Sequence, residues 1–256
     1  MLDAIAELVP RFVALATGSP ADLRVPATPA WTITDVVGHV AMEPMRYLEL
    51  AAGGGDWPHR VADLPAFNAQ QVADLPTRDI GELTDLLTSH TQRLVATIAE
   101  FDEPPLMRFD GDQFVPADLQ AGTFLGELIV HGRDIAHAAG KDWPIEPAMV
   151  PLVYLGLHQV LPGWVDPKGA AGHTATYELR LRGSTAYIYE FTDGRLQIDP
   201  PAARRVDAHI SADPVTALLT SYGRVGQIGP AITGKVLAWG RRPWLATSLR
   251  RRFMSV

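Results

Sequence analysis

The sequence predicts an α+β protein of two domains, a four-helix bundle followed by a layer of strands and helices. Up to about residue 140, apolar residues recur at three- and four-residue spacing, which is typical of amphipathic helices. From about residue 172, β-branched and aromatic residues alternate in short runs separated by turn residues, which indicates strands. We therefore expect a helical domain over residues 1–143 and an α+β domain over residues 144–256, with residues 144–171 as a linking helix.

Four amphipathic segments make up the expected bundle. The first covers residues 2–16 and ends at a Gly-Ser-Pro sequence, and the second begins after Thr32 and runs to the glycines at 53–55. Thr32 is a capping residue with Asp35 three positions on as its partner. A proline-containing loop at 57–76 precedes the third helix, at about 80–101, and the fourth runs from near Asp118 to Gly140. Four amphipathic helices joined by short and longer loops favour a four-helix bundle.

The second half reads as paired strands followed by helices. Strands are expected at 174–181, 185–191, 195–199 and 206–211, with glycine-containing turns between them. A short helix at 214–222, a strand near 234–240 and an amphipathic helix at 243–253 follow. This order predicts a sheet with helices over one face.

Composition limits the function classes. A net charge of −7 supplies no excess positive field, so we expect neither nucleic acid nor an acidic membrane as a partner. No apolar run approaches the roughly 20 residues that span a bilayer. The first residues contain Asp3 and Glu7 and lack the basic start of a secretory signal, so a cytoplasmic location is expected.

The sequence contains no cysteine. Disulfides, cysteine-bound zinc, iron–sulfur clusters and protein thiol nucleophiles are therefore excluded. Any metal must be held by His, Asp and Glu, and any thiol that reacts must come from outside the protein.

Three residues are candidates for a metal site. Glu127 and His131 are four residues apart, so on a helix their side chains share one face about one turn apart. Both flank the apolar seam of the fourth helix, and His39 flanks the seam of the second. Flanking positions on two helices converge at the groove between them, where bundles build metal sites. The same positions would also suit exposed polar residues.

Two motifs carry a resemblance to a known family. "PAWTITDVVGHV" (29–40) and "GELIVHGRDIAHAAG" (126–140) resemble the two signatures of the mycothiol-dependent maleylpyruvate isomerase family, a branch of the DinB-like metal-binding bundles. By that resemblance His39, Glu127 and His131 are the protein ligands of a divalent metal, usually zinc. Residues 207–224 and 232–246 are similar to the appended domain of these proteins, which has a sterol-carrier-protein-2-like (SCP2-like) fold.

A metal site with these ligands would be catalytic. Two histidines and one glutamate leave a coordination position open, and the remaining positive charge lowers the pKa of a bound water or thiol. By the resemblance, mycothiol is the thiol cosubstrate, and its thiolate attacks an electrophilic small molecule. Expelling the thiol afterwards makes the protein an isomerase, and retaining it makes the protein an S-transferase.

Two further residues are candidate catalytic groups. Asp134, three residues after His131, could orient a ligand as a neighbouring carboxylate, or it could be an exposed helix residue. Arg224 matches a Gly-Arg of the family's second domain and could bind a substrate carboxylate, or it could be an ordinary surface arginine.

Two other functions remain open from the sequence. The same ligands could activate water in a metal hydrolase, which would need no thiol. The second domain could instead carry a lipid or another hydrophobic ligand, with no enzymatic activity. The sequence fixes neither the physiological substrate nor the oligomeric state.

Overall fold

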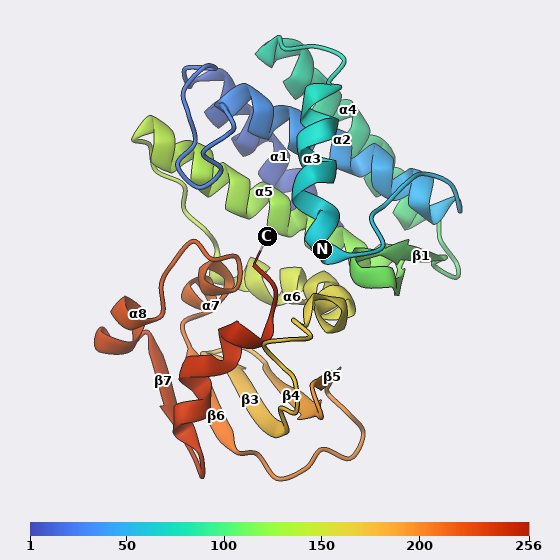
Figure 1. Cartoon of the computed structure of the whole chain (residues 1–256). Coiled ribbons are helices and arrows are strands. Elements are labelled where there is room, and N and C mark those ends of the chain that lie inside the picture. The colour runs from blue at the N-terminus through green and yellow to red at the C-terminus, as the bar shows by residue number, and fades with distance from the viewer. Residues whose placement is uncertain (256) are drawn as a thin grey trace. The chain divides into compact units, whose positions relative to one another are not determined.

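The computed structural model describes residues 1–255 and contains two compact units (Figure 1). The first comprises Met1–Ile145 and Leu152–Gln159, and the second comprises Glu146–Pro151 and the chain from Val160 onward. The first unit is mainly helical and the second contains a five-stranded sheet, so the predicted α+β class is confirmed. Within residues 1–255, no helix combines the length and the hydropathy that crossing a bilayer requires.

The first unit is built on four long helices: α1 (Leu2–Thr17), α2 (Ile33–Ala51), α4 (Ile80–Ala99) and α5 (Ala117–Ala139). Both α1 and α2 pack against α4 and against α5, so the helices close a ring in which α2 and α5 are neighbours. Their buried side chains form the core; they include Ile5, Phe12, Val36, Val40, Leu83, Leu87, Leu125 and Leu128. The predicted bundle therefore places the helix that carries His39 beside the helix that carries Glu127 and His131.

The start of α2 is fixed by a capping box. The hydroxyl of Thr32 accepts a hydrogen bond from the backbone N–H of Asp35, and the Asp35 carboxylate accepts one from the N–H of Thr32 at 2.8 Å. Arg78 pairs with the other carboxylate oxygen of Asp35. These bonds satisfy backbone donors that the first turn would otherwise leave unpaired. The predicted role of Asp35 as a helix-start partner is confirmed.

The prediction of a loop at 57–76 is wrong. A short 3-10 turn (Val61–Asp63) leads into a helix, α3 (Leu64–Ala73), which has Pro65 in its first turn, where proline is tolerated. Leu64 and Val72 are the buried residues of α3, so it lacks the apolar periodicity that marks a helix in a sequence. A hairpin of β1 (Leu106–Phe109) and β2 (Gln113–Pro116) before α5 was also not predicted.

A short helix, α6 (Val150–Val160), occupies part of the expected linking segment. It packs closely on α5 where Gly122 and Gly156 face each other's backbone. A Cβ atom on Gly122 would lie 2.5 Å from the carbonyl oxygen of Leu152, so the approach requires glycine.

The second unit contains β3 (Ala175–Leu181), β4 (Ala186–Thr192), β5 (Arg195–Ile198), β6 (Ala208–Ala212) and β7 (Val236–Trp239). The strand order is β5-β4-β3-β6-β7, with β3 and β6 parallel and the other neighbours antiparallel. The helices α7 (Pro214–Ser221) and α8 (Ile228–Ile232) lie between β6 and β7 in the chain, and α8 was not predicted.

The last segment, Pro243–Arg252, is a 3-10 helix where the sequence predicts an amphipathic α-helix. Leu245 is the one buried side chain in this segment, all of whose residues are described. An apolar face packed on the core is what stabilises most short α-helices, and this segment does not have one.

Candidate metal centre

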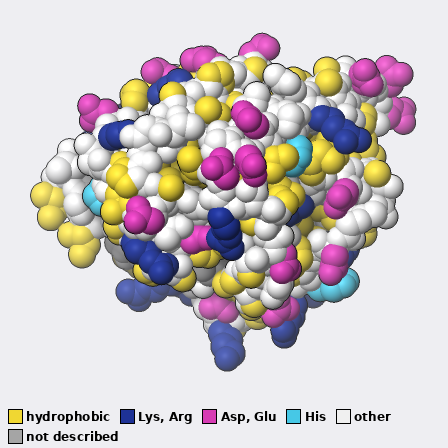
Figure 2. Space-filling model, turned by 90° about the horizontal axis from the view of Figure 1, so that it is seen from above, with side chains coloured by type: hydrophobic (Ala, Val, Ile, Leu, Met, Phe, Trp, Pro, Cys, Tyr) yellow, Lys and Arg dark blue, Asp and Glu magenta, His cyan; other side chains and the backbone are white. Residues whose placement is uncertain are grey.

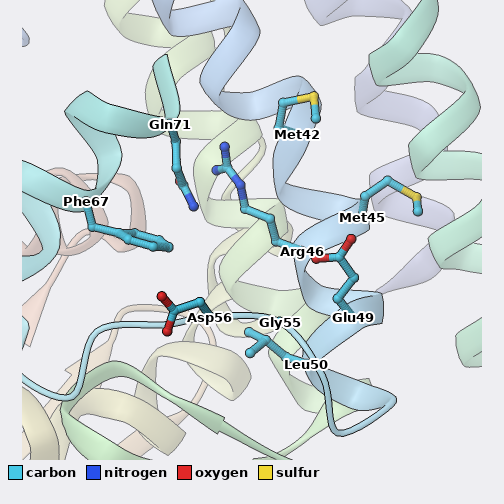
Figure 3. Close-up of a pocket in the computed structure, with 9 residues that line it drawn as sticks. All are labelled: Met42, Met45, Arg46, Glu49, Leu50, Gly55, Asp56, Phe67 and Gln71. Atoms are coloured by element: carbon cyan, nitrogen blue, oxygen red, sulfur yellow. The ribbon is translucent and has the colours of Figure 1, made fainter. Parts of the chain in front are cut away.

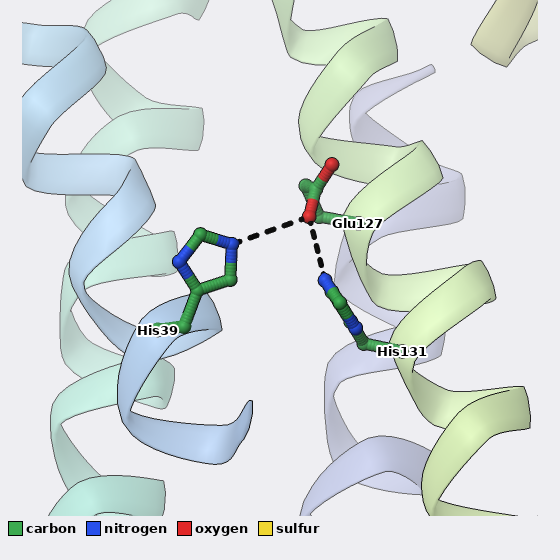
Figure 4. A group of neighbouring side chains, drawn as sticks. All are labelled: His39, Glu127 and His131. Carbon is green, nitrogen blue, oxygen red and sulfur yellow. Dashed lines mark ion pairs between the residues drawn. The ribbon is translucent and has the colours of Figure 1, made fainter. Parts of the chain in front are cut away.

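The ring of helices brings His39 of α2 together with Glu127 and His131 of α5 (Figure 4). One ligand atom from each residue lies within 4.8 Å of the others. The Nε2 atom of His39 is 3.5 Å from Oε2 of Glu127, and Nε2 of His131 is 3.0 Å from the same oxygen. Both imidazoles thus turn the same nitrogen toward one carboxylate oxygen.

The three side chains are more buried than the border position that the helix periodicity predicts. His39 is 5% exposed and His131 is 7% exposed, while the Glu127 side chain is 18% exposed. The indole of Trp31 packs on the His39 ring, with 5.2 Å between the ring centres. The two imidazoles lie 5.4 Å apart at an angle of 83°. Neither histidine is on a solvated helix face.

Two of the three separations between donor atoms are close to those around a tetrahedral ion. Zinc–nitrogen and zinc–oxygen bonds of about 2.0–2.2 Å at tetrahedral angles put neighbouring ligand atoms roughly 3.3–3.5 Å apart. The two separations from Glu127 Oε2, 3.0 Å and 3.5 Å, are close to that value. Two imidazoles and one carboxylate are also a donor set that zinc accepts, with a position left for another ligand.

The charges in the cluster are tightly coupled. Burial by itself would raise the pKa of Glu127, but pairing with His131 and His39 outweighs it and holds this pKa well below its usual value. Burial by itself would lower the pKa of His131, whereas its pairing with Asp134 and Glu127 raises that pKa to about 9. The cluster therefore stabilises positive charge beside an ionised carboxylate.

Asp134 lies next to the ring nitrogen of His131 that does not face Glu127. It is 1% exposed, and its Oδ2 atom is 3.5 Å from Nδ1 of His131. The alternative of an exposed helix aspartate is therefore wrong. A carboxylate on the second nitrogen of a metal-binding histidine fixes the orientation of the ring and its tautomer, and Asp134 has the position for that role.

A second buried carboxylate, Glu43, faces the cluster and was not predicted from the sequence. Glu43 is 3% exposed, and its Oε1 atom is 3.9 Å from Nδ1 of His39 and 2.7 Å from the Arg46 guanidinium. The sequence spacing could have identified this carboxylate. Glu43 follows His39 by four residues, and helical geometry puts such residues on one face.

A glycine lies beside each histidine and permits close packing. A Cβ atom on Gly38 would lie 2.2 Å from Leu75, and one on Gly132 would lie 2.3 Å from the indole of Trp143. The Trp143 indole in turn donates a hydrogen bond to the carbonyl of Ile129. Each glycine thus lets a neighbouring side chain, Leu75 or Trp143, pack directly on the helix that carries a cluster histidine.

A cavity of about 310 Å³ lies between α2, the loop after it, and α3 (Figure 3). Its lining combines thioether, aromatic and aliphatic groups with charged ones: Met42, Met45, Arg46, Glu49, Leu50, Gly55, Asp56, Phe67 and Gln71. The cluster residues do not line it. Arg46 connects the two regions, because it lines the cavity and pairs with Glu43.

Arg224 belongs to the second unit, in the turn that follows α7. Its guanidinium donates a hydrogen bond to the carbonyl of Tyr222 at 2.8 Å. Within its own unit Arg224 is partly buried, and its role toward a substrate stays a prediction.

Fold and cluster together define a helical bundle with a candidate mononuclear metal site, joined to an α+β domain. Residues 2–136, just over half of the chain, match the family model described as the mycothiol maleylpyruvate isomerase N-terminal domain. The chain belongs to this family. No curated protein sequence matches it.

Two solved structures share the fold. The crystal structure of the mycothiol-dependent maleylpyruvate isomerase aligns over 93% of this chain and 90% of its own, with 17% identity and a TM-score of 0.56. A histidine-to-alanine mutant of that isomerase aligns over the same shares, with 16% identity and a TM-score of 0.56. The similarity thus extends through the second unit, beyond the residues that the family model matches.

Proposed function

We propose that this protein is a metal-dependent enzyme that uses a small-molecule thiol, mycothiol, as nucleophile toward an electrophilic small molecule. The observation that carries the proposal is the His39–Glu127–His131 cluster in a chain of the mycothiol maleylpyruvate isomerase family. The absence of cysteine supports it, because the nucleophilic sulfur then has to come from a cosubstrate. Free small thiols persist in the reducing cytoplasm, which is where we place the reaction.

In this proposal His39, Glu127 and His131 hold a divalent ion, with zinc as the expected metal. Such an ion supplies Lewis acidity that lowers the pKa of a thiol bound in the open position. The residues of the chain provide the rest: burial of the cluster excludes bulk water, and Asp134 holds His131 in the ligand tautomer. Arg224 would bind a carboxylate of the electrophile.

The chemistry on the electrophile has two outcomes. Attack of the thiolate on an activated double bond forms a carbon–sulfur bond and allows rotation about the former double bond. Loss of the same thiol then gives an isomer, whereas protonation of the adduct gives a conjugate. Isomerase and S-transferase activity are therefore both consistent with the site.

The proposal is tested with zinc-loaded protein and an electrophilic acid such as maleylpyruvate, with and without mycothiol. We expect consumption that requires the thiol and is lost in His39→Ala. His137→Ala is the matched control, because His137 is exposed and lies on α5 beyond the cluster. Turnover at the same rate without thiol, with a bond of the substrate cleaved and water taken up in the products, would instead indicate a hydrolase. Arg224→Gln should raise KM more for an acid electrophile than for a neutral one.

A further inference from the structure

One ring nitrogen of His39, Nδ1, points away from Glu127 (Figure 4). Nδ1 of His39 is buried and has no hydrogen-bond partner among the described residues. The acidic group that faces it is the Glu43 carboxylate, one turn further along α2, at 3.9 Å. This distance is about 1 Å longer than a hydrogen bond.

Glu43 is held in place by its own surroundings. A buried carboxylate is stable only when it is paired, and Arg46 pairs with Oε1 of Glu43 at 2.7 Å. Arg46 itself is largely buried, with 15% of its side chain exposed, on the wall of the cavity drawn in Figure 3. The carboxylate oxygen that faces His39 is therefore held by the Arg46 guanidinium.

The same arrangement occurs on the other helix. His131 directs Nε2 to Glu127 and Nδ1 to the buried carboxylate of Asp134, which comes from its own helix. His39 directs Nε2 to Glu127 and Nδ1 to the buried carboxylate of Glu43. Carboxylates in this position set the tautomer of metal-binding histidines and raise their basicity.

We infer that Glu43 is a positioning residue of the metal centre: it holds the proton of neutral His39 on Nδ1 and leaves Nε2 free to bind the ion. A neutral imidazole carries one N–H, and a carboxylate beside Nδ1 stabilises the tautomer with the proton there. Arg46 contributes indirectly, because its guanidinium pairs with the Glu43 carboxylate and fixes its position. This inference rests on the proposed metal site.

The zinc affinity of the 256-residue chain tests this role of Glu43. We compare wild type with Glu43→Gln, which keeps the shape but loses the charge, and with Glu43→Ala, which removes the group. Glu49→Gln is the matched control, because Glu49 is an exposed glutamate on the same helix. The dissociation constant is measured by competition with a chromophoric chelator, and the visible absorption of the cobalt-substituted protein reports on ligand geometry.

We expect zinc binding to weaken roughly 10- to 100-fold in Glu43→Ala and by a smaller factor in Glu43→Gln, with altered cobalt bands in both. Glu49→Gln should match wild type. If the metal-free Glu43 variants lose thermal stability but keep wild-type zinc affinity and cobalt spectra, Glu43 is only structural and the inference fails. If wild type itself binds no zinc, the proposed metal site fails and the inference with it.

Discussion

Substitution of Gly132 by alanine tests the packing that holds His131 in place. Two effects oppose each other. Alanine in a helix interior is favoured over glycine by about 1 kcal/mol, which would stabilise α5. The new Cβ atom, however, would lie 2.3 Å from Cζ2 and 2.4 Å from Cε2 of Trp143. Carbon atoms pack at about 3.5–4.0 Å, so the indole has to move by more than about 1 Å.

The indole of Trp143 is not free to move without loss. It packs edge-on against Phe12, lies 5.1 Å from the Arg11 guanidinium carbon and donates a 3.0 Å hydrogen bond to the carbonyl of Ile129. Overpacking costs about 1–3 kcal/mol, and the lost hydrogen bond adds about 0.5–1.5 kcal/mol. The clash therefore outweighs the helix propensity, and we expect Gly132→Ala to lower the free energy of unfolding by roughly 2 kcal/mol.

Urea unfolding followed by circular dichroism measures this change. A double-mutant cycle identifies its source: in a Trp143→Leu background, Gly132→Ala should be neutral or stabilising by up to about 1 kcal/mol, because the clash is gone. A Gly132→Ala protein as stable as wild type would refute the packing argument. So would equal destabilisation in both backgrounds.

Three further predictions follow from the same structure. Thr32→Ala removes the capping box of α2 and should cost about 1 kcal/mol in urea unfolding, whereas Thr32→Ser should be close to neutral. Burial lowers the pKa of His158 to about 3, below its ordinary 6.5, so its contribution to stability is present above pH 6.5 and is lost as the pH falls toward 3. Between pH 7 and pH 5 wild type should lose roughly 2 kcal/mol more than His158→Gln, and equal pH dependence in the two proteins would contradict the assignment. Zinc at about 100 times its dissociation constant should stabilise wild type by about 2.7 kcal/mol in thermal unfolding, and the same zinc concentration should not stabilise His131→Ala.

The helices that carry the cluster could be predicted because their signals are local. Thr32 and Asp35 mark the start of α2, and the spacing of Glu127 and His131 places both on one face of α5. That His39 would lie beside them followed from the expectation of a bundle and from the resemblance to the isomerase family, since helix geometry permitted the site without requiring it. The structure brings the three side chains together, and their binding of a metal remains the proposal.

Other features depend on contacts that a single sequence does not display. The helix α3 has two buried residues and no clear periodicity, so it reads as a loop. The final 3-10 helix has an amphipathic sequence but buries little of its apolar side. The four-residue spacing puts Glu43 on the same helix face as His39, but its burial beside Arg46 depends on how α2 packs against its neighbours.

The distribution of surface charge also depends on the fold. The net charge of −7 predicts an acidic protein, and Figure 2 shows acidic side chains distributed over one face with basic side chains among them. The sum of the charges is known from the sequence, but their arrangement is set by the fold.

Among the buried polar residues, Glu43, His39, His131 and Asp134 all belong to the cluster or face it directly.

Metal content tests the central claim most directly. Wild type and His39→Ala are purified, dialysed exhaustively without chelator and measured by elemental analysis, with His137→Ala as the exposed-histidine control. We expect about one zinc or similar divalent ion per chain in wild type and in the control. We expect His39→Ala to lose this ion. A folded wild-type protein that holds no metal, even after zinc is added, would contradict the account.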